Sequence, residues 1–138
     1  MIHEIEMYHY LILHFPIALF ITGYIFDILG FFNKRSLLTQ FGYWNLNMGI
    51  FWGLLSIVSG LITDQDIGHM DSILPIWSTH GTHMIVAVLM FLVISIIRKL
   101  NKNKRINISS KLILLTHGLI VLFFIHGAHI GAKLADRV

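Results

Sequence analysis

Nine histidines occur in this chain of 138 residues, and six of them lie near the same ends of four long apolar stretches. Imidazole can ligate haem iron, copper or zinc, and it can also donate or accept a hydrogen bond. An ionisable group inside an apolar segment of membrane-spanning length is costly, and by default it indicates function. The chemistry open to these histidines therefore depends on which segments bring them to a common depth.

The apolar stretches cover residues 8–32, 41–63, 79–97 and 112–134. Each is about the 17–25 residues needed to cross a hydrocarbon core of roughly 30 Å. The chain is 56% hydrophobic and only 12% charged, with a mean hydropathy of +0.76, which leaves too little charge for the surface of a soluble domain. We therefore predict an all-α fold, a four-helix transmembrane bundle that forms a single domain over residues 1–138.

Basic residues in the connections predict the orientation of this bundle. They concentrate in the first and third connections: Lys34 and Arg35, then Arg98, Lys99, Lys102, Lys104, Arg105 and Lys111. Lysine and arginine favour the cytoplasmic side, so both termini are expected outside, in a multi-pass protein of the bacterial inner membrane. The net charge of +3 comes from these connections, and it is explained by this orientation and by attraction to anionic lipid headgroups. The lipid bilayer is thus an expected partner, and nucleic acid is not.

The absence of cysteine narrows the chemistry further. It excludes disulfides, thiolate metal sites and covalent haem attachment through a Cys-x-x-Cys-His motif. Residues 1–6 are acidic and no small-residue cleavage site follows the first apolar run, so that run is expected to be a retained helix. No nucleophile–base arrangement is apparent, which favours an electron carrier over a catalyst and leaves enzyme status open.

Helical rise places several imidazoles at one depth. Counted from the expected outer helix ends, His14, His83 and His129 lie about 9, 6 and 8 Å into the bundle. His80 is shallower and His126 is one turn deeper. Three different helices therefore bring histidines within one helical turn of a common level.

Two imidazoles from facing helices at one depth can serve as the axial ligands of a b-type haem. We expect the iron ligands among His14, His83 and His129. The wider cofactor-binding set is His14, His80, His83, His126, His129 and Lys133, in which Lys133 would pair with a haem propionate. Copper or zinc bound by the same histidines, or hydrogen bonding between helices without any ligand, remain open alternatives.

The leading hypothesis is therefore a membrane cytochrome of b type that transfers electrons. It would act alone or as a small subunit of a respiratory complex, with a periplasmic electron donor or a quinone as partner. The alternative is a non-haem membrane protein. It would be either a structural subunit of a larger complex or a copper- or zinc-binding protein that uses the same histidines and the loop aspartates Asp64, Asp66 and Asp71.

Two ionisable residues near the expected inner ends suggest structural roles. Asp27 is expected to pair with Lys34 or Arg35 in the first connection, with a role in a proton relay as the alternative. His117 lies at a level with no other histidine, and it is expected to contact a serine or threonine or to pair with Met48 in a mixed site.

A stripe of small residues follows one face of the second apolar stretch: Gly42, Gly49, Gly53, Ser56, Gly60 and Thr63. The spacing of Gly49 and Gly53 is typical of closely packed transmembrane helices. The stripe predicts helix packing, with a bare face for a flat cofactor as the alternative.

Short motifs at the helix ends suggest a family. The chain has His14-Phe15-Pro16-Ile17 in the first stretch, Gly60-x-x-x-Asp64 at the end of the second, a histidine (His80 or His83) opening the third, and His129-x-Gly131-Ala132-x-Leu134 ending the fourth. In these features it resembles a group of small bacterial four-helix membrane proteins, catalogued as a domain of unknown function and labelled predicted membrane proteins.

The resemblance covers nearly the whole chain and implies the four-helix topology. It favours His14, Asp64 and His129 as functional positions, and it implies no activity. Two departures from the family pattern, Tyr10 in place of a proline after His9 and Ala132 in place of a glycine, put His9 in doubt as a site residue.

Overall fold

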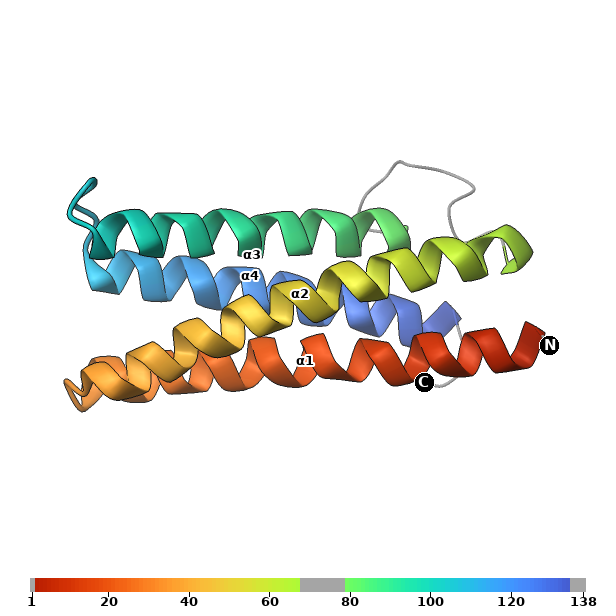
Figure 1. Ribbon diagram of the computed structural model, residues 1–138, viewed down its shortest axis with the longest axis horizontal. Coiled ribbons are helices and arrows are strands. Elements are labelled where there is room, and N and C mark those ends of the chain that lie inside the picture. Colours follow the sequence, from red (N-terminus) through yellow and green to blue (C-terminus); the bar gives the residue numbers. More distant parts are fainter. Residues whose placement is uncertain (1, 68–78, 135–138) are drawn as a thin grey trace.

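The computed structural model describes residues 2–67 and 79–134. This part of the chain forms four α-helices: α1 (Ile2–Phe32), α2 (Ser36–Ile67), α3 (His80–Lys102) and α4 (Ser110–Leu134). They lie along one another in an elongated bundle (Figure 1), in which α1 and α3 each pack against both α2 and α4. The predicted all-α four-helix transmembrane bundle is thus confirmed.

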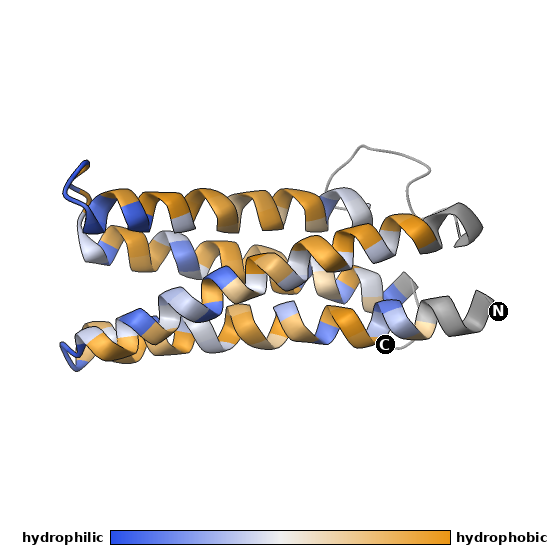
Figure 2. Cartoon of the chain, viewed as in Figure 1, coloured by the Kyte–Doolittle hydropathy of each residue, from blue (hydrophilic) through white to orange (hydrophobic). Residues whose placement is uncertain are grey.

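Each helix is long and apolar enough to cross a membrane, over Met7–Phe32, Ser36–Ile62, His80–Lys102 and Ser110–Lys133. Hydrophobic residues cover most of the helix surfaces, as Figure 2 shows. Many of the largest side chains point outward, and Leu119 on α4 is 68% exposed. Such a surface suits lipid rather than water, because lipid exerts no pressure to bury apolar side chains. The protein is therefore a multi-pass membrane protein.

All four helices extend beyond the apolar stretches that predicted them, at the start of α1 and α4, at both ends of α2 and at the end of α3. The second begins at Ser36 rather than at residue 41, and the third ends at Lys102 rather than at residue 97. Polar and basic residues lower the hydropathy of these end turns without interrupting the backbone hydrogen bonds. As a consequence Arg98, which we expected in a connection, lies inside α3.

The two ends of the bundle differ in charge. The start of α1 and the end of α4 lie at one end, which we call the terminal end, and connections 33–35 and 103–109 lie at the other (Figure 1). The second end carries Lys34, Arg35, Lys102, Lys104 and Arg105, and it is mostly blue in Figure 2. We call it the basic end. Its position on the cytoplasmic side stays a prediction.

An aromatic layer fills the middle of the bundle. Phe20 of α1 and Phe91 of α3 stack with ring centroids 3.7 Å apart, and Phe124 of α4 meets them edge-on at 5.0 and 5.7 Å. The three rings are at most 1% exposed. The remaining helix, α2, contributes Gly49, where a Cβ would lie 2.7 Å from the Phe20 ring. We call Phe20, Phe91 and Phe124 the phenylalanine layer.

The glycine face of α2 is covered by side chains of neighbouring helices. Four of its glycines contact one such side chain each: Gly42 contacts Asp27, Gly49 contacts Phe20, Gly53 contacts Val88 and Gly60 contacts His9. The absent Cβ atoms let these side chains approach the α2 backbone closely. This arrangement agrees with the helix-packing interpretation of the stripe.

Candidate functional site

A buried ion pair joins α1 to α3 across the bundle. The guanidinium of Arg98 donates two hydrogen bonds to the carboxylate of Asp27, one from Nη1 to Oδ2 and one from Nη2 to Oδ1 at 2.8 Å. The two side chains are only 8% and 7% exposed. A two-bonded fork of this kind fixes both the position and the orientation of the carboxylate.

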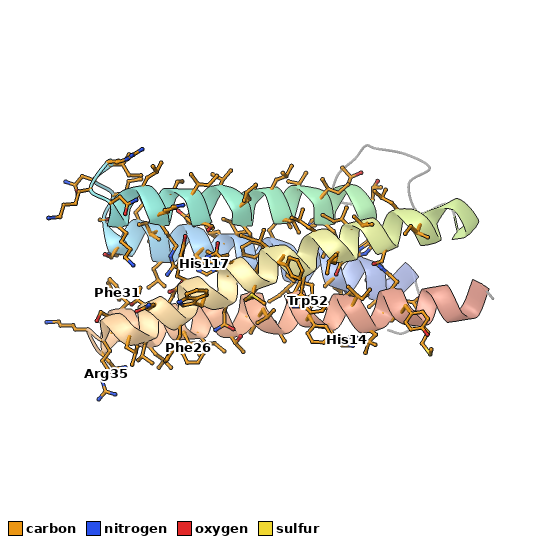
Figure 3. The ribbon with its side chains drawn as sticks, in the orientation of Figure 1. His14, Phe26, Phe31, Arg35, Trp52 and His117 are labelled. Atoms are coloured by element: carbon orange, nitrogen blue, oxygen red, sulfur yellow. The ribbon has the colours of Figure 1, made fainter. Side chains whose placement is uncertain are left out.

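Histidine 117 of α4 completes this cluster. Its Nδ1 lies 2.8 Å from Oδ2 of Asp27, the oxygen that also accepts from Arg98. A carboxylate held by an arginine fork can only accept, so Nδ1 carries the hydrogen and donates it. Three helices thus meet at one carboxylate, and Figure 3 shows His117 between the helices, in the half of the bundle toward the basic end.

The second helix contributes backbone and an aromatic face. Nη2 of Arg98 also donates to the carbonyl oxygen of Thr39 at 3.1 Å, in the first turns of α2. The guanidinium carbon lies 5.4 Å from the centre of the Tyr43 ring. A Cβ at Gly42 would lie 2.2 Å from Oδ1 of Asp27, so only glycine admits the carboxylate there.

The other imidazole nitrogen of His117 has no hydrogen-bond partner within the described ranges 2–67 and 79–134. His117 is 0% exposed, and its ring is met edge-on by Tyr24 at 5.4 Å and by Phe91 at 6.0 Å. An unpaired polar atom in such a place costs about 1–3 kcal/mol. With Nδ1 protonated, Nε2 holds a lone pair.

The cluster lies within the membrane-spanning part of each helix. Asp27 precedes the end of α1 at Phe32 by five residues, Arg98 precedes the end of α3 at Lys102 by four, and His117 follows the start of α4 at Ser110 by seven. These offsets correspond to depths of about 6–10 Å from the basic end. Asp27 and Arg98 cancel in charge, so the cluster is neutral while His117 is neutral.

The phenylalanine layer lies one heptad further along the same helices. Each cluster residue has a phenylalanine seven positions away, toward the terminal end: Phe20 for Asp27, Phe91 for Arg98 and Phe124 for His117. On α2 the same step separates Gly42, which contacts Asp27, from Gly49, which contacts Phe20. A heptad is two helical turns, so the backbone positions of the two layers are about 10 Å apart along the helix axes.

These contacts correct two expectations. Asp27 pairs with Arg98 and His117 and not with Lys34 or Arg35, which are exposed in the connection at the basic end. His117 contacts a carboxylate and not a serine, a threonine or Met48. The reason is the true length of α3, which brings Arg98 into the bundle.

The terminal half holds the histidines that we expected to bind a cofactor. Two of them lie at the α3–α4 interface and donate to carbonyl oxygens of α4: Nδ1 of His80 to Gly127 at 2.9 Å, and Nε2 of His83 to Phe123 at 2.8 Å. His83 is buried, stacks on the Phe123 ring at 3.8 Å and lies 5.5 Å from the His126 ring.

The other expected ligands lie on the surface of the bundle. His14 is exposed, and its Nδ1 is paired with the carbonyl of Tyr10 on its own helix. His126, His129 and Lys133 on α4 are exposed as well. His9, in contrast, is half buried between α1 and α2, where its Nδ1 lies 2.8 Å from the hydroxyl of Ser59. Asp64, Asp66 and Asp71 belong to residues whose side chains lie outside the described part.

These placements bear on a bound haem or metal. Among the described residues, no three histidine, aspartate or glutamate side chains form a group able to hold a metal ion. His14, His83 and His129 do not converge, because two are exposed and the Nε2 of the third is bonded to a carbonyl. The described side chains therefore do not fit a haem held by this trio, and haem binding through other terminal histidines stays a prediction.

Comparison with known proteins gives one match. A family model described as "Predicted membrane protein (DUF2231)" matches residues 7–138. No curated protein and no solved structure matches the chain. The resemblance inferred from the short motifs is thereby confirmed, and the match covers all three members of the buried cluster.

Proposed function

Because the chain belongs to the DUF2231 family of predicted membrane proteins, whose description states no activity, we propose a function from its buried cluster: the protein binds and releases a proton at His117. One observation carries this proposal. His117 is fully buried, one ring nitrogen donates to Asp27, and the other has no partner in the described part of the chain.

The geometry favours a proton over a larger ligand. Asp27 and Arg98 already satisfy each other, and the aromatic rings of Tyr24 and Phe91 lie against the imidazole. A proton on Nε2 needs no cavity. It converts the imidazole to an imidazolium, and the net charge of the cluster changes from 0 to +1. The adjacent carboxylate stabilises that cation, and the Arg98 guanidinium opposes it.

Such a site suits a proton relay or a proton-responsive switch. Ionisable side chains within membrane spans are rare, and they commonly mark proton pathways in pumps and transporters. The competing explanation is a purely structural tie between α1, α3 and α4. The two explanations differ in one respect, because a tie does not require His117 to change protonation state.

Infrared difference spectroscopy on protein with ¹³C-labelled aspartate tests the proposal. As the pH is lowered, protonation of His117 at Nε2 should shift the carboxylate band of Asp27. The shift should be lost in His117→Gln and kept in His14→Gln, because His14 is exposed and bonded to its own helix. A band that does not move, or that moves equally in both variants, would mean that the cluster has a structural role only.

Haem-dependent electron transfer is the second candidate function. It is favoured by the gathering of His80, His83 and His126 at the terminal end of the α3–α4 interface. A bound haem would supply one-electron chemistry there. A reduced-minus-oxidised spectrum of the purified protein should then show sharp haem bands that His126→Ala removes and His117→Ala retains. A spectrum without haem bands rejects this candidate, and elemental analysis for copper and zinc tests the remaining alternative.

A further inference from the structure

The phenylalanine layer closes one side of the cluster. The three rings span α1, α3 and α4 in mutual contact, and Gly49 lets Phe20 lie directly against α2. Protons move along polar groups or water, and the layer offers aromatic carbon only. Phe91 of this layer meets the His117 ring edge-on at 6.0 Å, and the buried residues between the two layers along the helices are mainly apolar: Leu46, Ile94, Ile120 and Val121.

The opposite side of the cluster is polar. Asp27 and Arg98 retain small exposed fractions, whereas His117 has none. Arg98 bonds the carbonyl of Thr39, three residues after the start of α2, and so extends the hydrogen-bonded groups toward the basic end. Asp27 therefore lies between His117 and the basic end.

The described charged and titratable side chains around His117 are few. Helix α1 contributes Asp27 and Tyr24, α3 contributes Arg98, and α2 contributes Tyr43 beneath the guanidinium. The half-buried and buried histidines His9, His80 and His83 belong to the terminal half, beyond the phenylalanine layer.

We infer that the proton bound at His117 enters and leaves from the basic end alone, because the phenylalanine layer blocks the terminal side. This inference rests on the proposed function and adds a direction to it. The protein by itself does not conduct protons along the length of the bundle. It exchanges them with one side, as a one-sided acceptor or sensor does.

Reconstituted vesicles can measure the direction of access. The chain lacks cysteine, so Lys104→Cys in the exposed connection 103–109 provides a unique thiol at the basic end. A membrane-impermeant thiol reagent then gives the fraction of molecules with that end facing outward. The Asp27 band is followed by time-resolved infrared spectroscopy after a rapid drop in external pH, and a protonophore is added afterwards.

The fast change in the Asp27 band should occur in the fraction of molecules whose thiol is accessible from outside. The band of the other molecules should change only after the protonophore is added. A fast change in all molecules overturns the one-sided access and leaves the proposed function intact. No change even with the protonophore overturns both. Phe91→Ala should extend the fast change to all molecules, and Phe91→Leu, which keeps most of the volume, should behave as the parent protein.

Discussion

Asp27 and His117 lie 90 residues apart in the chain, and a hydrogen bond of 2.8 Å joins them in the interior of the bundle, toward the basic end (Figure 3). The same carboxylate accepts two hydrogen bonds from Arg98. Removal of Asp27 therefore leaves both Arg98 and His117 without this partner, and removal of Arg98 or His117 leaves Asp27 with one partner fewer. The cluster behaves as a unit, and variants of its members are not expected to be additive.

Asp27→Asn keeps the shape of the side chain and removes its charge. Arg98 then lacks a counter-charge in a largely buried position, and the loss of a partner from a buried pair costs about 3–5 kcal/mol. Unfolding of the detergent-solubilised protein measures the loss. Lys34→Gln in the exposed connection is the control, with an expected change within about 0.5 kcal/mol. Equal stability of the two variants would contradict a buried ion pair.

Arg98→Lys and Arg98→Gln separate the charge from the fork. Lysine keeps a positive charge and loses the planar pair of donors that holds both carboxylate oxygens. We expect the free energy of unfolding to fall in the order parent, Arg98→Lys, Arg98→Gln. A glutamine variant as stable as the lysine variant would mean that the charge of Arg98 contributes nothing at this site.

Gly42→Ala tests the close approach of α1 to α2. A Cβ at this position would lie 2.2 Å from Oδ1 of Asp27, a fixed oxygen, so the helices must separate at a cost of about 1–3 kcal/mol. Gly53→Ala is the matched control on the same face, because its nearest atom is a Val88 methyl at 3.0 Å. The Asp27 band should shift in the first variant only. Identical effects on stability and spectrum would argue against this account of the stripe.

The two groups of histidines in the terminal half should differ in their effect on stability. His83→Ala removes a buried ring together with its hydrogen bond to the Phe123 carbonyl, at a cost of about 1–3 kcal/mol. His129→Ala changes an exposed residue, and its effect should stay within about 0.5 kcal/mol. Thermal unfolding of both variants checks the difference. A larger loss for His129→Ala would indicate a partner or ligand at that surface.

The fold could be predicted from the sequence because its cause is local. Apolar stretches of sufficient length must form helices in lipid, where backbone groups have no water to bond. Only the helix ends were misplaced, Ser36 and Lys102 among them, since hydropathy marks the apolar part of a helix and not its last polar turns.

That small error hid the site. With the third helix ended at residue 97, Arg98 was assigned to a connection, and Asp27 was left to pair with Lys34 or Arg35. The signal was nevertheless present, because Asp27, Arg98 and His117 lie four to seven residues from the helix ends at the basic end. Depth counted from these helix ends, in the way that grouped the terminal histidines, groups these three residues as well.

Rotation about each helix axis was the part that sequence could not supply. His14 shares a depth with His83, and yet one is exposed and the other is buried. Which face of a helix turns inward depends on packing against three neighbours, and apolar residues on every face leave no stripe to read.

Nitrogen-15 NMR of histidine-labelled protein, with His117 assigned by its loss in His117→Gln, tests the central claim most directly. The account predicts that Nδ1 stays protonated throughout, and that Nε2 changes from a lone pair to N–H as the pH is lowered over the range in which the protein stays folded. Nitrogen shifts of His117 that stay constant over that range, or a neutral form with its hydrogen on Nε2, would contradict it.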